Sequence, residues 1–421
     1  MNILRKLASE ISFSEVVEFC KEAHGEGVQI DYKMDFPSNG FAKHFAAFSN
    51  TRGGIIIVGI EEAKKSGIPV SWKGVTKDAK QIEKIHQAAS NVEPIPSYEV
   101  HATDEVEGKC FVLIRINEGD KTPYYVQNDS NIWVRTGNIS NPIGIASPDG
   151  LELLFGKRDK AEKARSLYLK ISDDAYRAGL EREEKERQRL IQVAKEKGEN
   201  VGNYYQQSLG AGVAMCTVVI QPYFPHKAIA NPRDIKAGLN ELRSRRGGRE
   251  FPDLNFGEPI PEGLFRFMHG YNGYIECQQV FGCGLVRNDL DVLEVDQNER
   301  RIVRIGFVIG TILKLLQFTN ALYNKFGYQG VLNGYVSLNG MKDAHTSVLK
   351  PSGWHFFGDD KKSLFNDYRW DLLLDTNILN DKELSRGYCY SLIKEIYWSL
   401  GYEEVNEKII DAFLEQNGLS F

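Results

Sequence analysis

Hydrophobic and polar positions along the chain change character near residue 150 and again near residue 210. Before residue 150, short apolar runs typical of strands are separated by stretches with the spacing of amphipathic helices. The stretch that follows is dense in charge, and after Gly210 strand-like and helical patterns alternate again. We therefore predict an α+β fold with an α/β domain over residues 1–150, a helical connector over 151–205 and a C-terminal α+β domain over 206–421.

The first domain is expected to open with two short helices over residues 1–24, with Ser12 or Ser14 as an N-cap. Its centre is a strand with Asp31 and Lys33, a helix around Phe41–Phe48 and an apolar strand over Ile55–Ile60. Further along, the pattern predicts a helix over Thr76–Ala89 and strands over Ser97–Ala102, Lys109–Ile116 and Ile132–Arg135.

The segment Lys157–Glu199 contains no proline and is rich in charged residues, which predicts one long helix. Its first half carries small and apolar residues at heptad spacing: Ala161, Ala164, Tyr168, Ile171, Ala175 and Ala178. This seam has two interpretations of equal weight, since it can pack on its own domain or pair with another subunit. We predict a homo-oligomer, most simply a dimer, that uses this helix together with the C-terminal domain.

The C-terminal half has the pattern of mixed strands and helices. The most apolar run, Ile302–Tyr323, is interrupted by Arg304, Lys314 and Gln317, which favours a buried helix over a membrane span. In the tail from Ser363, aromatic residues at helical spacing indicate core packing in a mostly helical context. The expected elements are a strand over Val213–Tyr223, a helix over Pro232–Arg245, a meander over Tyr274–Leu293, a helix over Ile302–Phe326 and a strand over Val331–Leu338; the aromatic residues are Trp370, Tyr388, Tyr390, Tyr397 and Trp398.

Composition narrows the possible functions. With 52 Lys and Arg against 57 Asp and Glu, the net charge of −5 argues against a generally basic nucleic-acid binder, so a basic patch must be local. One cluster in the second half, Arg243, Arg245, Arg246 and Arg249, has that character, although such loops are more often simply solvated. The six cysteines lack C-x-x-C spacing and no signal peptide is visible, which fits a reducing, cytoplasmic location.

Candidate chemistry collects between Gly25 and Glu62. Residues an odd number apart on a strand point to opposite faces, so Glu26 must precede the strand if it is to share a cleft with Asp31. Asp31 and Lys33 do share a face. Three acidic residues taken at random are mostly solvated, but carboxylates gathered near a lysine can hold Mg²⁺ or Mn²⁺ and leave positions for water and a phosphate oxygen.

Three motifs carry a resemblance to a known family. These are the ExxxxDYK pattern of residues 26–33, AAFSNTRGGIIIVGIEE of residues 46–62, and the later PYY and IWVRTGN segments. Together they resemble the Schlafen-type AlbA_2 domain over roughly the first third of the chain. In nuclease members of that family three acidic residues bind the metal, and the resemblance implies Glu26, Asp31 and Glu62 here, with Asp31 in place of the usual Glu and Glu62 in place of the usual Asp.

Further site residues are expected near the three carboxylates. Lys33 is expected to act with the three carboxylates in catalysis, while Arg52, Lys43 and Arg135 are expected to contact nucleic acid. Strand alternation places Glu61 and Glu62 on opposite faces, so only one of the two can serve. The choice of Glu62 depends on the motif alone.

The Asn50–Gly54 turn in the same stretch contains two consecutive glycines. Because the chain contains no G-x-x-x-x-G-K-[ST] motif, we interpret the turn as a tight helix-to-strand connection with Gly53 or Gly54 at positive φ, and not as a nucleotide loop. Arg52 is then left free to meet a nucleic-acid backbone.

Our first functional hypothesis is a metal-dependent endonuclease of the Schlafen type. The resemblance favours RNA, including tRNA, over DNA as the substrate and implies a bacterial defence or stress effector. The C-terminal half would then serve as a sensor or target-selection module. The alternatives are a non-catalytic nucleic-acid-binding regulator and an assembly protein that uses the central helix.

Overall fold

The structure is a computed structural model of the whole chain. The described residues are 3, 6, 8–37, 40–63, 66–119, 121–136, 139–144, 148–199, 212–223, 225, 228–242, 251–253, 257–269, 274–347, 361–403 and 405–416. The arginine cluster at Arg243, Arg245, Arg246 and Arg249 lies outside them.

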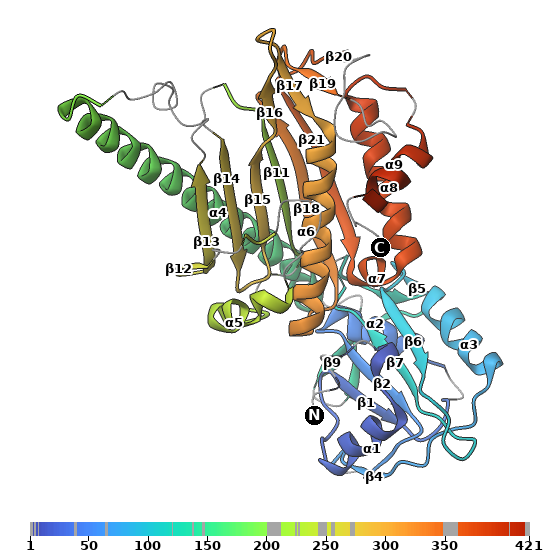
Figure 1. Cartoon of the computed structure of the whole chain (residues 1–421). Coiled ribbons are helices and arrows are strands. Elements are labelled where there is room, and N and C mark those ends of the chain that lie inside the picture. Colours follow the sequence, from blue (N-terminus) through green and yellow to red (C-terminus); the bar gives the residue numbers. More distant parts are fainter. Residues whose placement is uncertain are drawn as a thin grey trace. The chain divides into compact units, whose positions relative to one another are not determined.

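The chain forms two compact units (Figure 1). The N-terminal unit comprises Met1–Lys163 and Asn324–Val331, and the C-terminal unit comprises Ala164–Tyr323 and Leu332–Phe421. The mixed helix and strand content confirms the predicted α+β class.

The N-terminal unit follows the predicted order of elements. Ser12 caps the first α-helix in a reciprocal arrangement with Glu15, as its spacing suggests. The elements are a 3₁₀ helix Ala8–Glu10, α1 (Phe13–Lys21), β1 (Ile30–Lys33), α2 (Ala42–Asn50), β2 (Gly54–Val58), β3 (Glu61–Glu62), β4 (Pro69–Ser71), α3 (Ala79–Ser90), β5 (Val92–Glu93), β6 (Tyr98–Ala102), β7 (Val112–Ile116), β8 (Tyr125–Val126), β9 (Asn131–Thr136) and β10 (Ile139–Gly144).

The main sheet of this unit has the order β1-β2-β7-β6. β1 pairs parallel with β2, and the remaining neighbours are antiparallel. One face packs on α1 and the N-terminal segment through Tyr32, Ile55 and Ile57, and the other on α2 and α3 through Ile56 and Val58. Because both faces are covered, Asp31 is buried together with its neighbour Tyr32.

The turn between α2 and β2 requires glycine at two positions. Gly53 and Gly54 have φ values of 61° and 153°, which confirms the predicted positive φ. A Cβ atom on Gly54 would lie 2.3 Å from the carbonyl oxygen of Gln29. The turn therefore brings the start of β2 directly against the segment that leads into β1.

The C-terminal unit contains the remaining elements. The helix α6 is long and apolar enough to cross a membrane, but 67% of its most apolar window is buried inside the protein, as expected for a core helix. The elements are α4 (Pro148–Glu196), which begins in the N-terminal unit, then β11 (Met215–Pro222), α5 (Pro232–Leu242), β12 (Glu258–Ile260), β13 (Gly263–His269), β14 (Ile275–Phe281), β15 (Val286–Asp291), β16 (Leu293–Val295), β17 (Arg301–Arg304), α6 (Ile305–Phe326), β18 (Val331–Asn339), β19 (His345–Ser347), β20 (Lys361–Lys362), β21 (Asp367–Asp375), α7 (Thr376–Asn380), α8 (Lys382–Ser399) and α9 (Glu407–Gln416).

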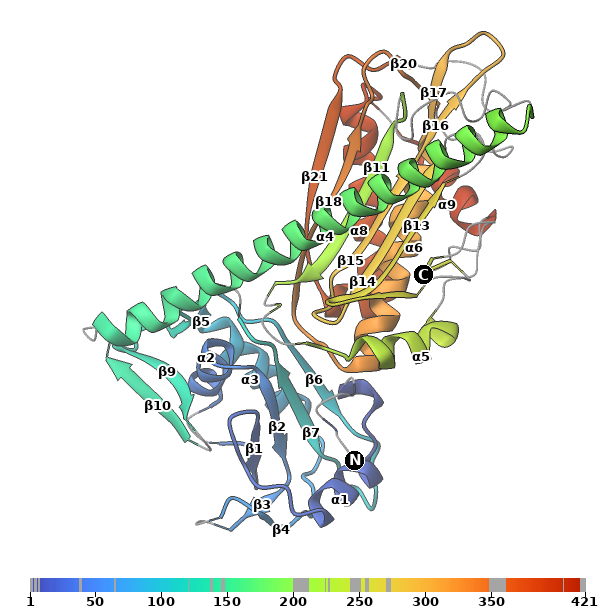
Figure 2. The ribbon, with the colours of Figure 1, turned by 90° about the vertical axis from the view of Figure 1, so that its left-hand side faces the viewer.

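The large sheet of the C-terminal unit has the order β12-β13-β14-β15-β11-β18-β21. Figure 2 shows α4 crossing one face of this sheet, with α6 and α8 behind it on the other. The apolar side of α4 packs on the sheet through Tyr168, Ile171, Ala175 and Leu180. Gly179 permits the close approach, since a Cβ atom there would lie 2.6 Å from the ring of Phe265.

This packing favours the first of the two interpretations of the heptad seam. Tyr168, Ile171 and Ala175 pack on the chain's own sheet, whereas Ala178 is exposed. A dimer that uses this helix stays a prediction. The long helix itself is confirmed, and it begins at Pro148, nine residues before the expected start.

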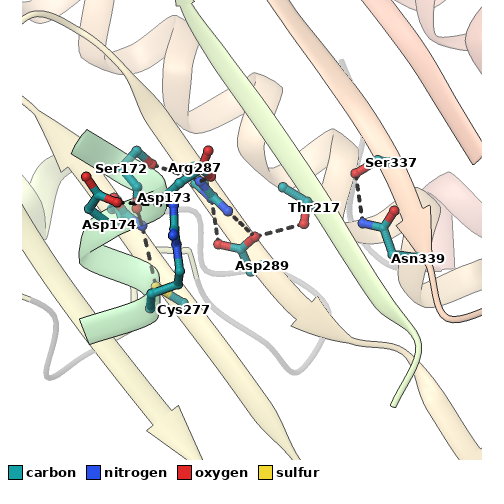
Figure 3. A network of polar contacts seen from close by, with 11 residues as sticks. Ser172, Asp173, Asp174, Thr217, Cys277, Arg287, Asp289, Ser337 and Asn339 are labelled. Atoms are coloured by element: carbon teal, nitrogen blue, oxygen red, sulfur yellow. Dashed lines mark hydrogen bonds and ion pairs between the residues drawn. The ribbon is translucent and has the colours of Figure 1, made fainter. Parts of the chain in front are cut away.

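A buried polar network, here called the α4 clamp, also fixes the helix on the sheet (Figure 3). Arg287 of β15 binds both carboxylate oxygens of Asp289, at 2.7 and 3.0 Å, and donates to Ser172 Oγ on α4 at 3.1 Å. The same guanidinium pairs with Asp173 of α4, and Thr217 Oγ1 donates to Asp289 at 2.8 Å. These contacts fix the register of α4 along the strands.

The aromatic residues of the tail lie on a strand and a helix. Trp370 lies on the strand β21, whereas a mostly helical context was expected. Tyr388, Tyr390, Tyr397 and Trp398 lie on α8, where the side chain of Trp398 is 65% exposed.

All six cysteines are free and buried, and burial raises the pKa of each thiol.

Candidate functional site

The three predicted carboxylates come from three successive segments of the N-terminal unit. Glu26 lies in the loop between α1 and β1, Asp31 in β1 and Glu62 in β3. The position of Glu26 before the strand is the one that strand alternation required. Its backbone N–H donates to the Gly67 carbonyl at 2.8 Å, and its Oε1 accepts from the Tyr32 N–H at 2.6 Å.

Glu26 and Glu62 form one half of the site. Burial, the adjacent Glu62 carboxyl and the charge of Asp31 together raise the pKa of Glu26 to about 8. Glu62 Oε2 is buried and accepts no hydrogen bond, whereas the neighbouring Glu61 is exposed. The structure thus places Glu62, and not Glu61, beside Glu26.

Asp31 forms the other half and is surrounded by nitrogen atoms. Lys33 Nζ lies 2.7 Å from Oδ2, Arg135 Nη1 lies 3.1 Å from Oδ1, and His44 Nδ1 lies 3.5 Å from Oδ2. Burial alone would raise the pKa of Asp31, but the charges around it lower the pKa below its usual value. Asp31 is therefore ionised; its Oδ1 accepts a hydrogen bond from Arg135, and its Oδ2 forms an ion pair with Lys33 without a hydrogen bond of good geometry.

Arg135 was expected to contact nucleic acid, and the structure gives it a different position. Its side chain is only 1% exposed and lies between Asp31 and the Phe48 ring, with 4.6 Å from the guanidinium carbon to the ring centroid. A residue enclosed in this way does not meet a phosphate from solvent. The prediction is corrected: β9 passes over α2, and this crossing turns Arg135 inward.

The other two expected nucleic-acid contacts lie elsewhere on α2 and the turn after it. Arg52 is exposed, as predicted from the turn. Lys43 is half-buried, and its Nζ lies 5.7 Å from the centroid of the Trp133 ring. Neither of these residues pairs with the three carboxylates among the interactions of the described residues.

Comparison with known proteins places this geometry in a family. The family model described as Schlafen, AlbA_2 matches residues 26–144, which include all three carboxylates. The N-terminal unit is a Schlafen AlbA_2-type domain. Among solved structures, the chain is similar to the N-terminal domain of a putative ATP-dependent DNA helicase RecG-related protein from Nitrosomonas europaea, with 18% identity, a TM-score of 0.26, and coverage of 32% of this chain and 94% of that one. No curated protein matches the chain.

His44 is the residue of the AlbA_2 domain that sequence reasoning missed. It is buried on α2 beside Asp31, and burial lowers its pKa to about 4, so its imidazole is neutral near pH 7. At that pH the cations that balance Asp31 are Lys33 and Arg135. The sequence did contain a signal for it: His44 is a polar residue within the apolar pattern of α2, between Phe41 and Phe45, on the side of the helix that faces the sheet.

The residues of the AlbA_2 domain can be tested against the divalent cation that the family implies. Within the described residues, no group of three or more His, Cys, Asp or Glu side chains already has the arrangement of a metal site. The donor types nevertheless fit Mg²⁺ or Mn²⁺, since Glu26 and Glu62 are adjacent oxygen ligands and Glu62 Oε2 is a buried acceptor with no donor.

Proposed function

We propose that the AlbA_2 domain is a metal-dependent endonuclease, with RNA, including tRNA, as the favoured substrate. The observation that supports this most is the convergence of Glu26 and Glu62 in a partly buried place, where the pKa of Glu26 is raised to about 8 and Glu62 Oε2 has no hydrogen-bond partner among the described residues. Such crowding costs stability unless a cation balances it, so it is typical of a site and not of a structural core.

The proposal gives each residue a role. Glu26, Asp31 and Glu62 would hold Mg²⁺ or Mn²⁺, which when bound supplies a Lewis acid for the phosphodiester and lowers the pKa of a bound water. Lys33, which lies two residues after Asp31 on β1 and pairs with it, would stabilise negative charge on the reacting phosphate. Arg52, on the exposed turn, would contact the nucleic-acid backbone.

The sharpest test compares substitutions of the predicted ligands with a substitution of Glu61, the residue next to Glu62. Glu62→Gln and Glu26→Gln are expected to lower Mn²⁺-dependent cleavage of total RNA at least about 100-fold, because each removes a charged ligand. Glu61→Gln is the matched control, since Glu61 is the next residue and is exposed. Assays on plasmid DNA run in parallel separate RNA from DNA as the substrate. Full activity in both Glu62→Gln and Glu26→Gln would contradict the proposal.

A second candidate function is supported by the state of Asp31. Both of its oxygens are engaged by Lys33 and Arg135, which suits a domain that binds nucleic acid without cleaving it. This regulator would bind RNA or DNA equally well in the presence of EDTA, and Glu62→Gln would leave its affinity unchanged. Metal-dependent cleavage by the wild-type protein excludes it.

The remaining parts of the proposal concern the cellular setting. We propose a bacterial defence or stress effector of the cytoplasm whose C-terminal unit selects the target or senses the signal. The homo-oligomer also stays a proposal; Tyr168, Ile171 and Ala175 pack on the chain's own sheet, which leaves the remaining surface of α4 and of the C-terminal unit for the interface. Light scattering of the purified protein measures its stoichiometry directly.

A further inference from the structure

The guanidinium group of Arg135 holds the loop that carries Glu26. Its Nη2 donates to the carbonyl oxygens of Gly27, at 2.7 Å, and Ile30, at 3.1 Å. The Gly27 N–H also donates to the Ile30 carbonyl at 3.1 Å, so these two residues form the ends of a closed turn. The turn starts immediately after Glu26 and ends immediately before Asp31.

The other nitrogen of the same guanidinium group fixes Asp31. Nη1 donates to Asp31 Oδ1 at 3.1 Å, which leaves Oδ2 on the side of Lys33 and His44. One planar group thus binds the residue after Glu26, the residue before Asp31 and Asp31 itself. A lysine, with a single nitrogen, cannot make these contacts at once.

Arg135 is in turn held by α2 and the residue that follows it. The Phe48 ring lies 4.6 Å from its guanidinium carbon, and its backbone N–H donates to Thr51 Oγ1 at 2.9 Å. Thr51 Oγ1 itself donates to the Ala47 carbonyl at 2.8 Å, which ties this contact to the end of α2. The helix α2 therefore fixes the orientation of the Arg135 guanidinium group.

We propose that Arg135 is a positioning residue that sets the separation of Glu26 and Asp31, and thereby the affinity of the site for a divalent cation. This rests on the proposed function, because it assumes that these carboxylates bind a metal. The arrangement matches the general behaviour of groups behind metal ligands, which orient a ligand by binding its second oxygen. Arg135 itself touches neither metal nor substrate.

Two other roles for Arg135 predict different results. A phosphate contact would require exposure that the side chain does not have. If Arg135 were instead a counter-ion that competes with the metal for Asp31, its removal would raise the affinity for the cation, whereas loss of a positioning residue lowers it. Metal affinity without substrate therefore separates positioning from competition.

The test uses the full chain and compares Arg135→Lys with Arg115→Lys. Arg115 is a matched control because it is also buried in the N-terminal unit and also donates to backbone carbonyls, those of Ile3 and Lys6. Mn²⁺ affinity is measured by calorimetry without nucleic acid. We expect a loss of at least about tenfold in Arg135→Lys and less than about twofold in Arg115→Lys. Unchanged or tighter binding in Arg135→Lys would overturn the proposal.

Hydrogen exchange supplies a readout that does not depend on metal. The Tyr32 amide donates to Glu26 and the Gly27 amide to Ile30, so both report on the turn directly. In Arg135→Lys these two amides should exchange at least about tenfold faster, while that of Ile57 in the central strand β2 stays protected. Equal exchange in the variant and the wild type would refute the positioning role.

The double variant Asp31→Asn with Arg135→Gln covers the case in which Arg135→Lys does not fold. It removes both charges of the buried Asp31–Arg135 pair together, so neither is left as an unpaired buried ion; Lys33, the other partner of Asp31, is partly exposed. Faster exchange at Gly27 in this variant supports positioning by the guanidinium group, and wild-type exchange contradicts it. If the wild type binds no Mn²⁺ at all, the proposed nuclease function fails, and the exchange result decides separately whether Arg135 holds the turn.

Discussion

Each unit contains a buried aspartate–arginine pair beside its main sheet, and the two pairs have different surroundings. In the C-terminal unit, Arg287 and Asp289 bind each other through two hydrogen bonds. The hydroxyls of Ser172 and Thr217 complete the network, and Asp173, which is partly exposed on α4, pairs with the same guanidinium (Figure 3). In the N-terminal unit, Asp31 and Arg135 adjoin two more carboxyls, Glu26 and Glu62, and Glu62 Oε2 has no hydrogen-bond partner among the described residues.

The difference separates a structural network from a candidate site. A buried network in which donors match acceptors fixes one arrangement, and the α4 clamp does this for a helix on a sheet. A network of crowded carboxyls with a buried oxygen that lacks a donor is incomplete as a structure. A ligand that completes it is the simplest reason for such an arrangement.

The largest expected effect comes from breaking the α4 clamp. Arg287→Met leaves Asp289 buried beside an apolar side chain, which should lower the free energy of unfolding of the C-terminal unit by about 3–5 kcal/mol. Chemical denaturation followed in that unit measures the loss. The double variant Arg287→Met with Asp289→Leu should regain most of it, because no unpaired charge is left. A single variant as stable as the wild type would show that the clamp is not structural.

Substitution of Lys33 is expected to have an effect of similar size on the rate of RNA cleavage, and not on the stability of the fold. Lys33→Ala removes a cation from the incomplete network while Arg135 still balances Asp31. Cleavage should slow by about 10²–10³-fold, with little change in RNA affinity measured without divalent metal, because the cation acts mainly on the transition state. An equal loss in binding and in rate would make Lys33 an ordinary backbone contact.

Ile171 tests how α4 uses its apolar face. Because Ile171 packs on the sheet, Ile171→Glu should destabilise the C-terminal unit by about 2–4 kcal/mol and leave the mass of the particle unchanged. Lys170→Glu, at the exposed neighbouring position, should change stability by less than about 0.5 kcal/mol. If Ile171→Glu is as stable as the wild type but has half its mass by light scattering, the seam is a subunit interface after all.

The most gradual effect is a pH dependence of stability that belongs to the N-terminal unit. The pKa of Glu26 rises from 4.5 to about 8 on folding, through burial and the charges of Glu62 and Asp31. The folded protein then retains a proton that the unfolded chain has lost, so stability from this group is full below about pH 4.5 and disappears as the pH rises through 8. The slope is at most about 1.4 kcal/mol per pH unit. Urea unfolding between about pH 5 and pH 8 should show this slope in the wild type and not in Glu26→Gln.

Much of the fold could be predicted because it depends on local pattern. The strands at Ile55 and Lys109, the Ser12 cap and the glycine turn at Gly53 each carry their signal within a few residues. The start of α4 at Pro148 and the strand β21 were missed, since a helix can extend through a weak pattern and aromatic residues suit a sheet as well as a helix.

The candidate site was predictable only in part for a related reason. Motif spacing suggested Glu26, Asp31 and Glu62, but the partners of Asp31 depend on packing between segments far apart in the chain. Arg135 is 104 residues from Asp31 and reaches it because β9 lies on α2. No periodicity within β9 distinguishes an arginine that faces solvent from one that turns inward.

The burial of all six cysteines has a practical consequence for studying the protein. Thiols with raised pKa values react slowly with maleimides, since the thiolate is the nucleophile. A single cysteine introduced at an exposed position of α4, such as Glu186→Cys, should therefore take up a fluorophore with little background from the native thiols. Its anisotropy would follow RNA capture in real time on an otherwise unmodified chain.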